Sequence, residues 1–313
     1  MLSRRDFLNS TIGAGVALAA QGVQQAGAQT TAPARKRMIV DAQCHLWKAE
    51  SADWKWVPGR PPQMPEPFTI EKLVPLMDEA GVDRVVVVPP SWPGDRNDYG
   101  LEAARRYPER FHVMGRLPLE KPESAALLPK WKEQPGMLGV RLTFLGPQEK
   151  WVTDGTADWF WPAAEKAGLP VMFLAPGHGA DFARIAERHP GLTLIIDHMN
   201  VTLDIAKNNK VPEALAQTVA LAKYPNVSCK VSASPGISSE PYPFADVKPH
   251  LRRVFEAFGR ERCYWGTDMT NSFAKATYRQ RVTQFTETLD FLTEEDKDWV
   301  MGRAILARLA WKA

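Results

Sequence analysis

The stretch MIVDAQCHLW, residues 38–47, decides the fold, because an apolar run gives way in it to alternating polar residues. This pattern predicts a buried strand whose last residues emerge at a polar rim. Side chains alternate along a strand, so Gln43 and His45 should share one of its faces. The two side chains are therefore a candidate part of a functional site. The alternative is that His45 is a hydrogen-bonded strand-end histidine and Gln43 a turn residue.

From residue 70 onward, helical and strand patterns alternate along the chain. Residues 70–81 have the spacing of an amphipathic helix ended by a glycine, and the run DRVVVVP at 83–89 is typical of a strand buried on both faces. The predicted strands after the opening stretch are 83–89, 110–117, 137–144, 169–175, 192–198, 226–232 and 262–268. The predicted helices are 70–81, 98–107, 123–132, 157–168, 180–189, 212–223, 244–258, 277–292 and 293–311.

Counting the opening stretch, eight strands alternate with helices, which predicts an α/β protein folded as a single (β/α)8 TIM barrel over residues 38–313. Parallel strands need helical crossovers, and the helices then cover the outer face of the sheet. The alternative is an open, doubly wound sheet. No glycine-rich phosphate-binding turn follows any of the predicted strands, so the barrel is favoured.

Residues 1–28 have the pattern of a twin-arginine signal peptide. SRRDFL at 3–8 carries the arginine pair, and an apolar run at 11–20 and the small residues AGA at 26–28 follow it. The apolar run is too short to span a bilayer, so no membrane span is expected. We expect export by the twin-arginine (Tat) machinery to the periplasm or medium, with residues 29–37 as a flexible leader.

Charge and cysteine content narrow the function classes. The 39 Lys and Arg residues against 36 Asp and Glu give a net charge of +3, which offers no electrostatic case for binding nucleic acid. Cys44, Cys229 and Cys263 are an odd number without CxxC spacing, and strand parity places them on the helix-facing side. We expect buried, unpaired thiols. The expected partner is a small-molecule substrate, and the oligomeric state stays open.

In such a barrel the chemistry occurs at the carboxyl ends of the strands. Two histidines, a carboxylate, an arginine and a lysine fall at the ends of different predicted strands, and buried charges there need partners. These residues are His45, Arg141, His198, Lys230 and Asp268. The connection 48–67 is rich in Trp and Pro and too long for an ordinary loop. It predicts a substrate cover, or alternatively a surface cover packed on the barrel.

Taken in order, five motifs resemble those of the amidohydrolase superfamily, over essentially the whole mature chain. They are DxxxHLW at 41–47, GVRL at 139–142, DH at 197–198, KxS at 230–232 and WGTD at 265–268. The resemblance is strongest to the branch that holds decarboxylases of the amino-carboxymuconate type and lactonases acting on pyrone dicarboxylate and sugar lactones. In its metal-dependent members, strand one carries His-x-His, strand five a metal-binding His, strand six a His and strand eight an Asp.

Carried over, the resemblance implies catalytic roles for His45, His198 and Asp268. Gln43 stands where the first His of strand one is expected, and the nearest candidate for the strand-five His is His178. A neutral amide is a poor ligand for zinc. We therefore expect no metal cofactor. If Zn or Mn is bound, His45, His178 and Asp268 are the expected ligands.

The metal-free lactonases of this branch imply that Asp268 activates a water that attacks a lactone or ester carbonyl, with Arg141 and the histidines stabilising the oxyanion. Arg141 and Lys230 favour an anionic substrate; the alternative for Arg141 is an ion pair with a rim carboxylate such as Asp268. The remaining predicted substrate contacts are Gln43, Trp56, Trp92 and His178, the tryptophans favouring a planar ring. The expected function is a lactone hydrolase. The alternatives are a metal-dependent decarboxylase or hydratase of the same superfamily and a non-catalytic, exported carboxylate-binding barrel.

Overall fold

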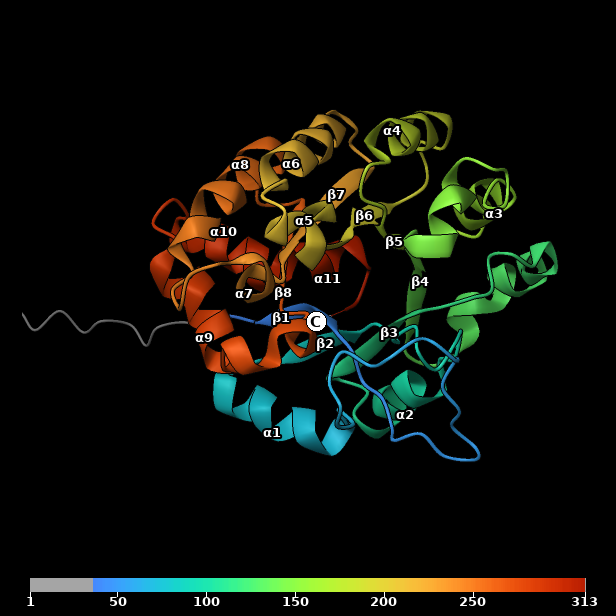
Figure 1. Ribbon diagram of the computed structural model, residues 1–313, viewed down its shortest axis with the longest axis horizontal. Coiled ribbons are helices and arrows are strands. Elements are labelled where there is room, and N and C mark those ends of the chain that lie inside the picture. Colours follow the sequence, from blue (N-terminus) through green and yellow to red (C-terminus); the bar gives the residue numbers. More distant parts are fainter. Residues whose placement is uncertain (1–35, 313) are drawn as a thin grey trace, which may run out of the picture. The chain divides into compact units, whose positions relative to one another are not determined.

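The computed structural model of the chain describes residues 36–312. The predicted signal peptide and most of the leader lie outside these residues, so export stays a prediction. Within the described residues, eight parallel strands follow one another in chain order around a nearly closed barrel with helices outside it (Figure 1). The strands are β1 (Val40–Cys44), β2 (Arg84–Val87), β3 (Phe111–Gly115), β4 (Met137–Thr143), β5 (Val171–Leu174), β6 (Leu194–Ile196), β7 (Val227–Ser232) and β8 (Cys263–Gly266). This arrangement is consistent with the expected TIM barrel.

The α-helices form most of the outer layer. They are α1 (Ile70–Ala80), α2 (Asp98–Arg106), α3 (Phe160–Lys166), α4 (Gly179–Arg188), α5 (Leu203–Lys207), α6 (Val211–Ala220), α7 (Ser234–Ile237), α8 (Lys248–Phe258), α9 (Tyr278–Thr283), α10 (Glu294–Asp298) and α11 (Ala304–Arg308). Several connections are 3₁₀ helices, namely Pro122–Glu133, Gly146–Val152, Asp197–Asn200, Leu221–Lys223, Ala245–Val247 and Met269–Lys275. Two segments are π-helical, Gln284–Thr288 and Trp299–Arg303.

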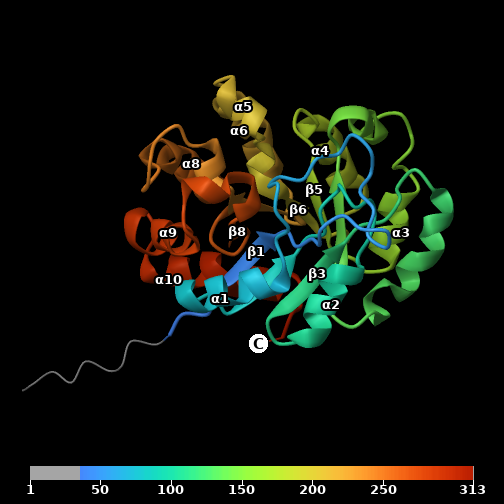
Figure 2. The same cartoon turned by 60° about the horizontal axis from the view of Figure 1, so that its bottom comes forward.

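Three predicted helices differ from the observed ones, and the one predicted over 293–311 is α10 and α11 joined by the π-helical segment Trp299–Arg303. The segment predicted as a helix over 123–132 is a 3₁₀ helix, and it contains Pro129, which has no N–H to donate within a helix. The helix predicted over 277–292 is α9 followed by a π-helical turn that ends before Leu289. The connection between β1 and α1 contains no helix or strand, as predicted, and Figure 2 shows it as a long irregular segment.

The barrel closes where β8 meets β1. The Asp268 backbone N–H donates to the Gln43 carbonyl at 2.9 Å. Gly266 permits this close approach, because a Cβ there would lie 3.1 Å from the Gln43 nitrogen. Asp41 is fully buried and accepts hydrogen bonds from the Thr267 N–H at 2.8 Å and from the Tyr278 hydroxyl at 2.8 Å. The WGTD motif thus joins β8 to β1 at the rim where the predicted site residues lie.

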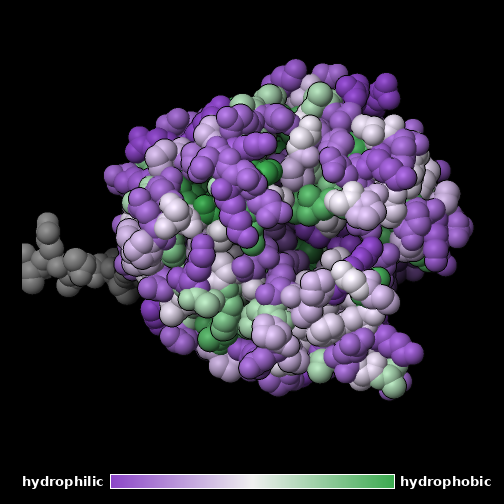
Figure 3. All heavy atoms as spheres, in the orientation of Figure 1, coloured by the Kyte–Doolittle hydropathy of each residue, from purple (hydrophilic) through white to green (hydrophobic). Residues whose placement is uncertain are grey.

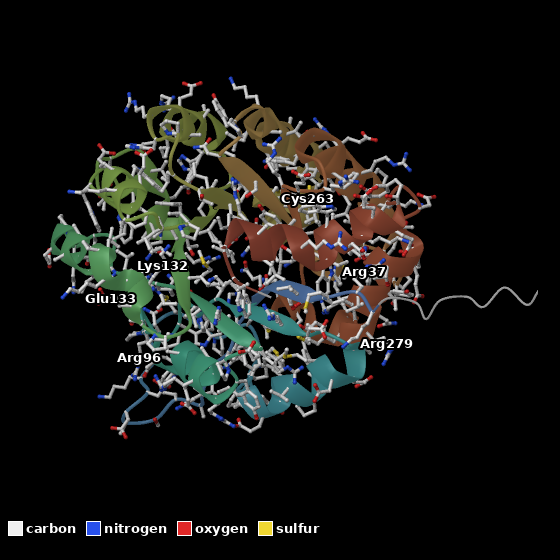
Figure 4. The ribbon with its side chains drawn as sticks, turned by 180° about the vertical axis from the view of Figure 1, so that it is seen from behind. Arg37, Arg96, Lys132, Glu133, Cys263 and Arg279 are labelled. Carbon is white, nitrogen blue, oxygen red and sulfur yellow. The ribbon has the colours of Figure 1, made fainter. Side chains whose placement is uncertain are left out.

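Buried apolar residues of the described chain form two clusters, one inside the barrel and one between the sheet and the helices. The inner cluster includes Val86, Met114 and Ile195. All three cysteines belong to the outer cluster and are buried and unpaired, as predicted. Cys263, labelled in Figure 4, has its sulfur 3.9 Å from the Val254 carbonyl of α8.

The C-terminal segment packs against the amino-terminal end of the barrel. Trp311 and Leu309 belong to the inner cluster together with Val40 at the start of β1. Arg37, labelled in Figure 4, pairs with Glu294 at 2.7 Å and Asp298 at 2.8 Å, which ties the start of the barrel to α10. The opposite end is left open for the predicted site. Among residues 36–312, no helix has both the length and the apolar character needed to cross a membrane.

Candidate active site

The end of β1 turns Gln43 and His45 toward the barrel interior. Asp41 and Cys44 are three positions apart but pair with residues of β2 that are only two apart, so β1 contains a bulge. A bulge re-aims the side chains beside it. The His45 ring Nδ1 lies 2.6 Å from the Val88 carbonyl. Because a carbonyl only accepts, Nδ1 carries a proton and Nε2 is the atom that faces the site.

His198 lies in a backbone turn that the sequence pattern did not predict. The strand predicted to reach His198 ends at Ile196, and that prediction is wrong by two residues. The three residues that begin with His198 have φ values of 50°, 57° and 56°. Residues other than glycine rarely adopt this left-handed conformation, and such strain is concentrated at functional sites. The turn brings the His198 ring to Ser232, with Nδ1 at 2.8 Å from the hydroxyl, and to Gln43, with Nε2 at 3.0 Å from the amide nitrogen.

Asp268 lies between the two histidines. Its Oδ1 is 3.1 Å from His45 Nε2, and its Oδ2 is 3.4 Å from His198 Nε2 and accepts a hydrogen bond from the Asn271 amide. Burial raises the pKa of the Asp268 carboxyl, but His198, His45 and Asn271 outweigh it and hold that pKa well below its usual range. Asp268 is therefore ionised at neutral pH.

One oxygen of Asp268 has an unused acceptor position. Within residues 36–312, Oδ1 makes no hydrogen bond of good geometry, although His45 Nε2 is 3.1 Å away. Since His45 Nδ1 already donates to a carbonyl, an ion pair with Asp268 requires the doubly protonated imidazolium. With a neutral His45 ring, no side chain within residues 36–312 donates to Asp268 Oδ1.

Lys230 lies behind these residues and is completely buried. Its Nζ donates to Gln43 Oε1 at 2.6 Å and pairs with Asp197 Oδ1 at 2.9 Å. Arg141 Nε donates to the other Asp197 oxygen at 3.1 Å. The alternative stated above for Arg141, an ion pair with a rim carboxylate, is therefore what the structure contains, with Asp197 as the partner.

Lys230 also fixes the protonation of His198. The ammonium requires the oxygen of the Gln43 amide to face it, so the amide nitrogen faces His198 Nε2 and donates to it. His198 is then protonated on Nδ1, which donates to Ser232. Burial lowers the pKa of His198, although Asp268 and Asp197 act in the opposite direction. A neutral His198 ring with a defined tautomer follows.

The donors at the site do not fit a catalytic divalent metal. The lone pair of His198 Nε2 faces the N–H of Gln43, and the nearby Lys230 ammonium opposes a second cation. Only His45 and Asp268 remain as neighbouring ligands, whereas catalytic zinc sites use three protein ligands.

His178, the third residue of the predicted ligand set, does not join this cluster. It lies at the start of α4, where its Nδ1 is 2.8 Å from Asp181 Oδ2. In the described part of the chain, no group of three or more His, Cys, Asp or Glu side chains is arranged to hold a metal ion.

A cavity of about 340 Å³ opens over Asp268. Figure 3 shows this face of the molecule hollowed near its centre. Of the predicted site residues, the cavity is lined by His45, Trp92, Arg141, His198 and Asp268. Four others do not line it: Gln43 and Lys230 form the layer behind, Trp56 packs against the core, and His178 pairs within α4.

Two residues near the site were not among the site residues predicted from the sequence. Arg116 follows β3 directly, and the rule that polar residues at strand ends form the site would have found it. Asn271 lies in the 3₁₀ helix after β8 and donates to Asp268, and no sequence signal marks it.

The chain is similar to known proteins over most of its length. The chain is 29% identical over 234 residues to an L-fucono-1,5-lactonase from Burkholderia ambifaria, covering 73% of this chain and 79% of the relative. Its fold is similar to that of a zinc-bound amidohydrolase from Burkholderia multivorans, with a TM-score of 0.74, 18% identity, and coverage of 87% and 99% of the two chains. It is also similar to a protein described as a 2-pyrone-4,6-dicarboxylic acid hydrolase from Pseudomonas putida, with a TM-score of 0.71, 20% identity, and coverage of 89% and 99%. Residues 40–305 match the sequence profile of the Amidohydrolase family. The chain belongs to the amidohydrolase family and is a hydrolase.

Proposed function

We propose that this protein opens a lactone ring by hydrolysis, with Asp268 activating the water and without a catalytic metal. The observation that carries the proposal is the placement of Asp268, an ionised and buried carboxylate between two imidazoles at a cavity wall. Its unused Oδ1 acceptor position suits a water whose proton must be removed.

In this mechanism a water donates its hydrogen bond to Asp268 Oδ1 and attacks the lactone carbonyl. The proton passes to Asp268 as the carbon–oxygen bond forms, and negative charge develops on the carbonyl oxygen. Arg141 lines the cavity and can stabilise this oxyanion. Collapse of the tetrahedral intermediate breaks the ring bond, and the leaving alkoxide takes the proton back from Asp268.

The low pKa of Asp268 limits how much of the rate enhancement general-base catalysis by this residue can supply. A carboxylate with a depressed pKa is a weak general base, since efficiency is greatest when the pKa lies near the working pH. Stabilisation of the oxyanion and positioning of the water must therefore supply most of the rate enhancement. Lactones suit such a site because the ester carbonyl needs less activation than an amide.

The relatives support a lactone as the substrate class. The curated relative is an L-fucono-1,5-lactonase, and it aligns with most of this chain. The zinc-bound structure shares the fold at 18% identity. The layer that Gln43, Lys230 and Asp197 form in this chain favours hydrolysis without a catalytic metal.

Asp268→Asn tests the proposal. The rate of hydrolysis is measured with a panel of sugar and pyrone lactones by monitoring the protons released. This rate should fall by about 10²- to 10⁴-fold, the range for loss of a general base. Binding of the ring-opened acid, measured by calorimetry, should remain. Asp204→Asn is the matched control, because Asp204 is an exposed carboxylate that lines the same cavity. Turnover that is unchanged in Asp268→Asn, or absent in the wild type with every lactone, would overturn the proposal.

A further inference from the structure

A second cavity, of about 250 Å³, adjoins the catalytic one. Arg141 and Thr143 of β4 line both cavities and form the wall between them. Arg60, from the long connection after β1, and Arg116, from the end of β3, also line the second cavity. The two cavities therefore meet at β4, and the second one adds two arginines beside the catalytic cavity.

Arg116 is held rigidly and has unsatisfied donors. Its backbone N–H donates to the Asn97 side chain at 2.7 Å, and its carbonyl accepts from the same amide at 2.8 Å. The side chain is only 6% exposed, and its one hydrogen bond within residues 36–312 runs from Nε to Asp95 at a long 3.4 Å. Nη1 is buried without a partner in the same range. A buried guanidinium donor left unpaired costs free energy that a bound acceptor would recover.

The charges around the second cavity leave positive charge uncompensated. Burial and the neighbouring Arg141 lower the pKa of Arg116 to about 10, and Asp95 offsets this only in part. Arg116 is therefore cationic at neutral pH and lacks a full counter-charge. Arg60 donates to the carbonyl of Ser91, which is a neutral acceptor. The two carboxylates in the wall, Asp95 and Glu120, are both exposed to solvent.

We infer that the second cavity binds an anionic group, a carboxylate in the first instance, carried by the substrate whose lactone ring lies over Asp268. The inference rests on the proposed function for the ring and adds the substrate class: lactones of sugar diacids or similar acid-bearing lactones. Arg116 grips the carboxylate with its planar fork, and Arg60 approaches it from the covering loop.

This assignment replaces the one that sequence patterns gave to Arg141 and Lys230. Both of those side chains are committed to Asp197 in the structure, so neither is free to hold a substrate carboxylate as its main partner. Arg116 and Arg60 make the better anion site, because both line the second cavity, Arg116 has an unpaired Nη1 within residues 36–312, and Arg60 donates to a neutral backbone carbonyl.

The test compares two lactones in the wild type, Arg116→Gln and Arg116→Lys. The first is the γ-lactone of galactaric acid, which carries a free carboxylate, and the second is that of galactonic acid, which carries a hydroxymethyl group instead. In Arg116→Gln, kcat/KM for the acid-bearing lactone should fall by about 10- to 100-fold, mainly through KM, with the neutral lactone almost unchanged. Arg116→Lys should recover part of the loss. Retained turnover of the neutral lactone shows that the catalytic site is intact.

A binding experiment separates this inference from the proposed function. Galactarate should bind the Asp268→Asn protein, and calorimetry should show about 10- to 100-fold weaker binding when Arg116→Gln is added. If Arg116→Gln does not fold, Arg60→Gln takes its place in both measurements. Arg84→Gln is the control for loss of a buried arginine, since Arg84 is also 6% exposed and donates to the Lys312 carbonyl.

The outcomes are distinct. Lactone hydrolysis with no preference for the acid-bearing lactone, or a preference that survives both arginine substitutions, overturns this inference and leaves the proposed function standing. Arginine-dependent binding of galactarate without hydrolysis of any lactone supports the anion site and overturns the proposed function. Absence of galactarate binding to the Asp268→Asn protein overturns the anion site, whose unpaired donors would then be satisfied by water alone.

Discussion

Lys230→Met removes the buried charge that organises the layer behind the catalytic cavity. The ammonium is completely buried, 2.9 Å from Asp197 Oδ1 and 2.6 Å from Gln43 Oε1. Its removal leaves Asp197 with Arg141 as its only cationic partner among the described residues, at 3.1 Å, and leaves the Gln43 oxygen unpaired. Breaking a buried ion pair by removing one partner costs about 3–5 kcal/mol. We expect a loss of that size in the free energy of unfolding.

Urea denaturation followed by fluorescence measures this free energy, provided that the slope m stays the same between variants. Adding Asp197→Asn should return part of the loss, because the double variant no longer buries an undercompensated carboxylate. Lys72→Met is the control: Lys72 pairs with Glu66 on the surface, so its removal should change the free energy by less than about 1 kcal/mol. A loss below about 1 kcal/mol in Lys230→Met, or a double variant no more stable than the single one, would refute the reasoning.

The position of Gln43, the low pKa of Asp268 and the packing of Gly139 each give a further prediction. Gln43→His alone should gain no stoichiometric zinc by elemental analysis, because the Lys230 ammonium stays beside the new imidazole; one zinc per chain would contradict this. The pKa of Asp268 is lower in the folded protein than in the unfolded chain, so its stabilisation is present above about pH 4 and is lost as the pH falls through the folded pKa. Asp268→Asn should therefore lose less stability than the wild type between about pH 5 and pH 2 in acid titrations, and equal losses would contradict the sign. Gly139→Ala should cost about 1–3 kcal/mol in urea denaturation, since its Cβ would collide with the Pro170 carbonyl, and an unchanged midpoint would exclude the clash.

Burial and periodicity were sufficient to predict most of the barrel. The continuous β-branched run of β2 indicated a strand buried on both faces, and side-chain alternation along β7 assigned its inward face. That parity predicted the outward cysteines and the inward Lys230. The neighbouring positions of His45, His198 and Asp268 followed from the geometry of parallel strands, since the carboxyl ends of all the strands meet at one rim.

The parts that could not be predicted depend on contacts between distant segments. The left-handed turn at His198 contradicts its local preference and persists because the ring is held by Ser232 and Gln43 from other strands. The bulge in β1 is a matter of register with β2, which a single strand's pattern does not contain. The pairing of Arg141 with Asp197 likewise needs the positions of β4 and β6.

The central claim is that Asp268 and its neighbours hydrolyse a lactone without a metal. The most direct measurement is kcat/KM for lactone hydrolysis by the wild-type protein before and after exhaustive treatment with a chelator, with metal content determined on the same samples. The account predicts unchanged kcat/KM in protein that holds no stoichiometric metal. Activity that disappears with the chelator and returns when Zn²⁺ or Mn²⁺ is added would contradict it.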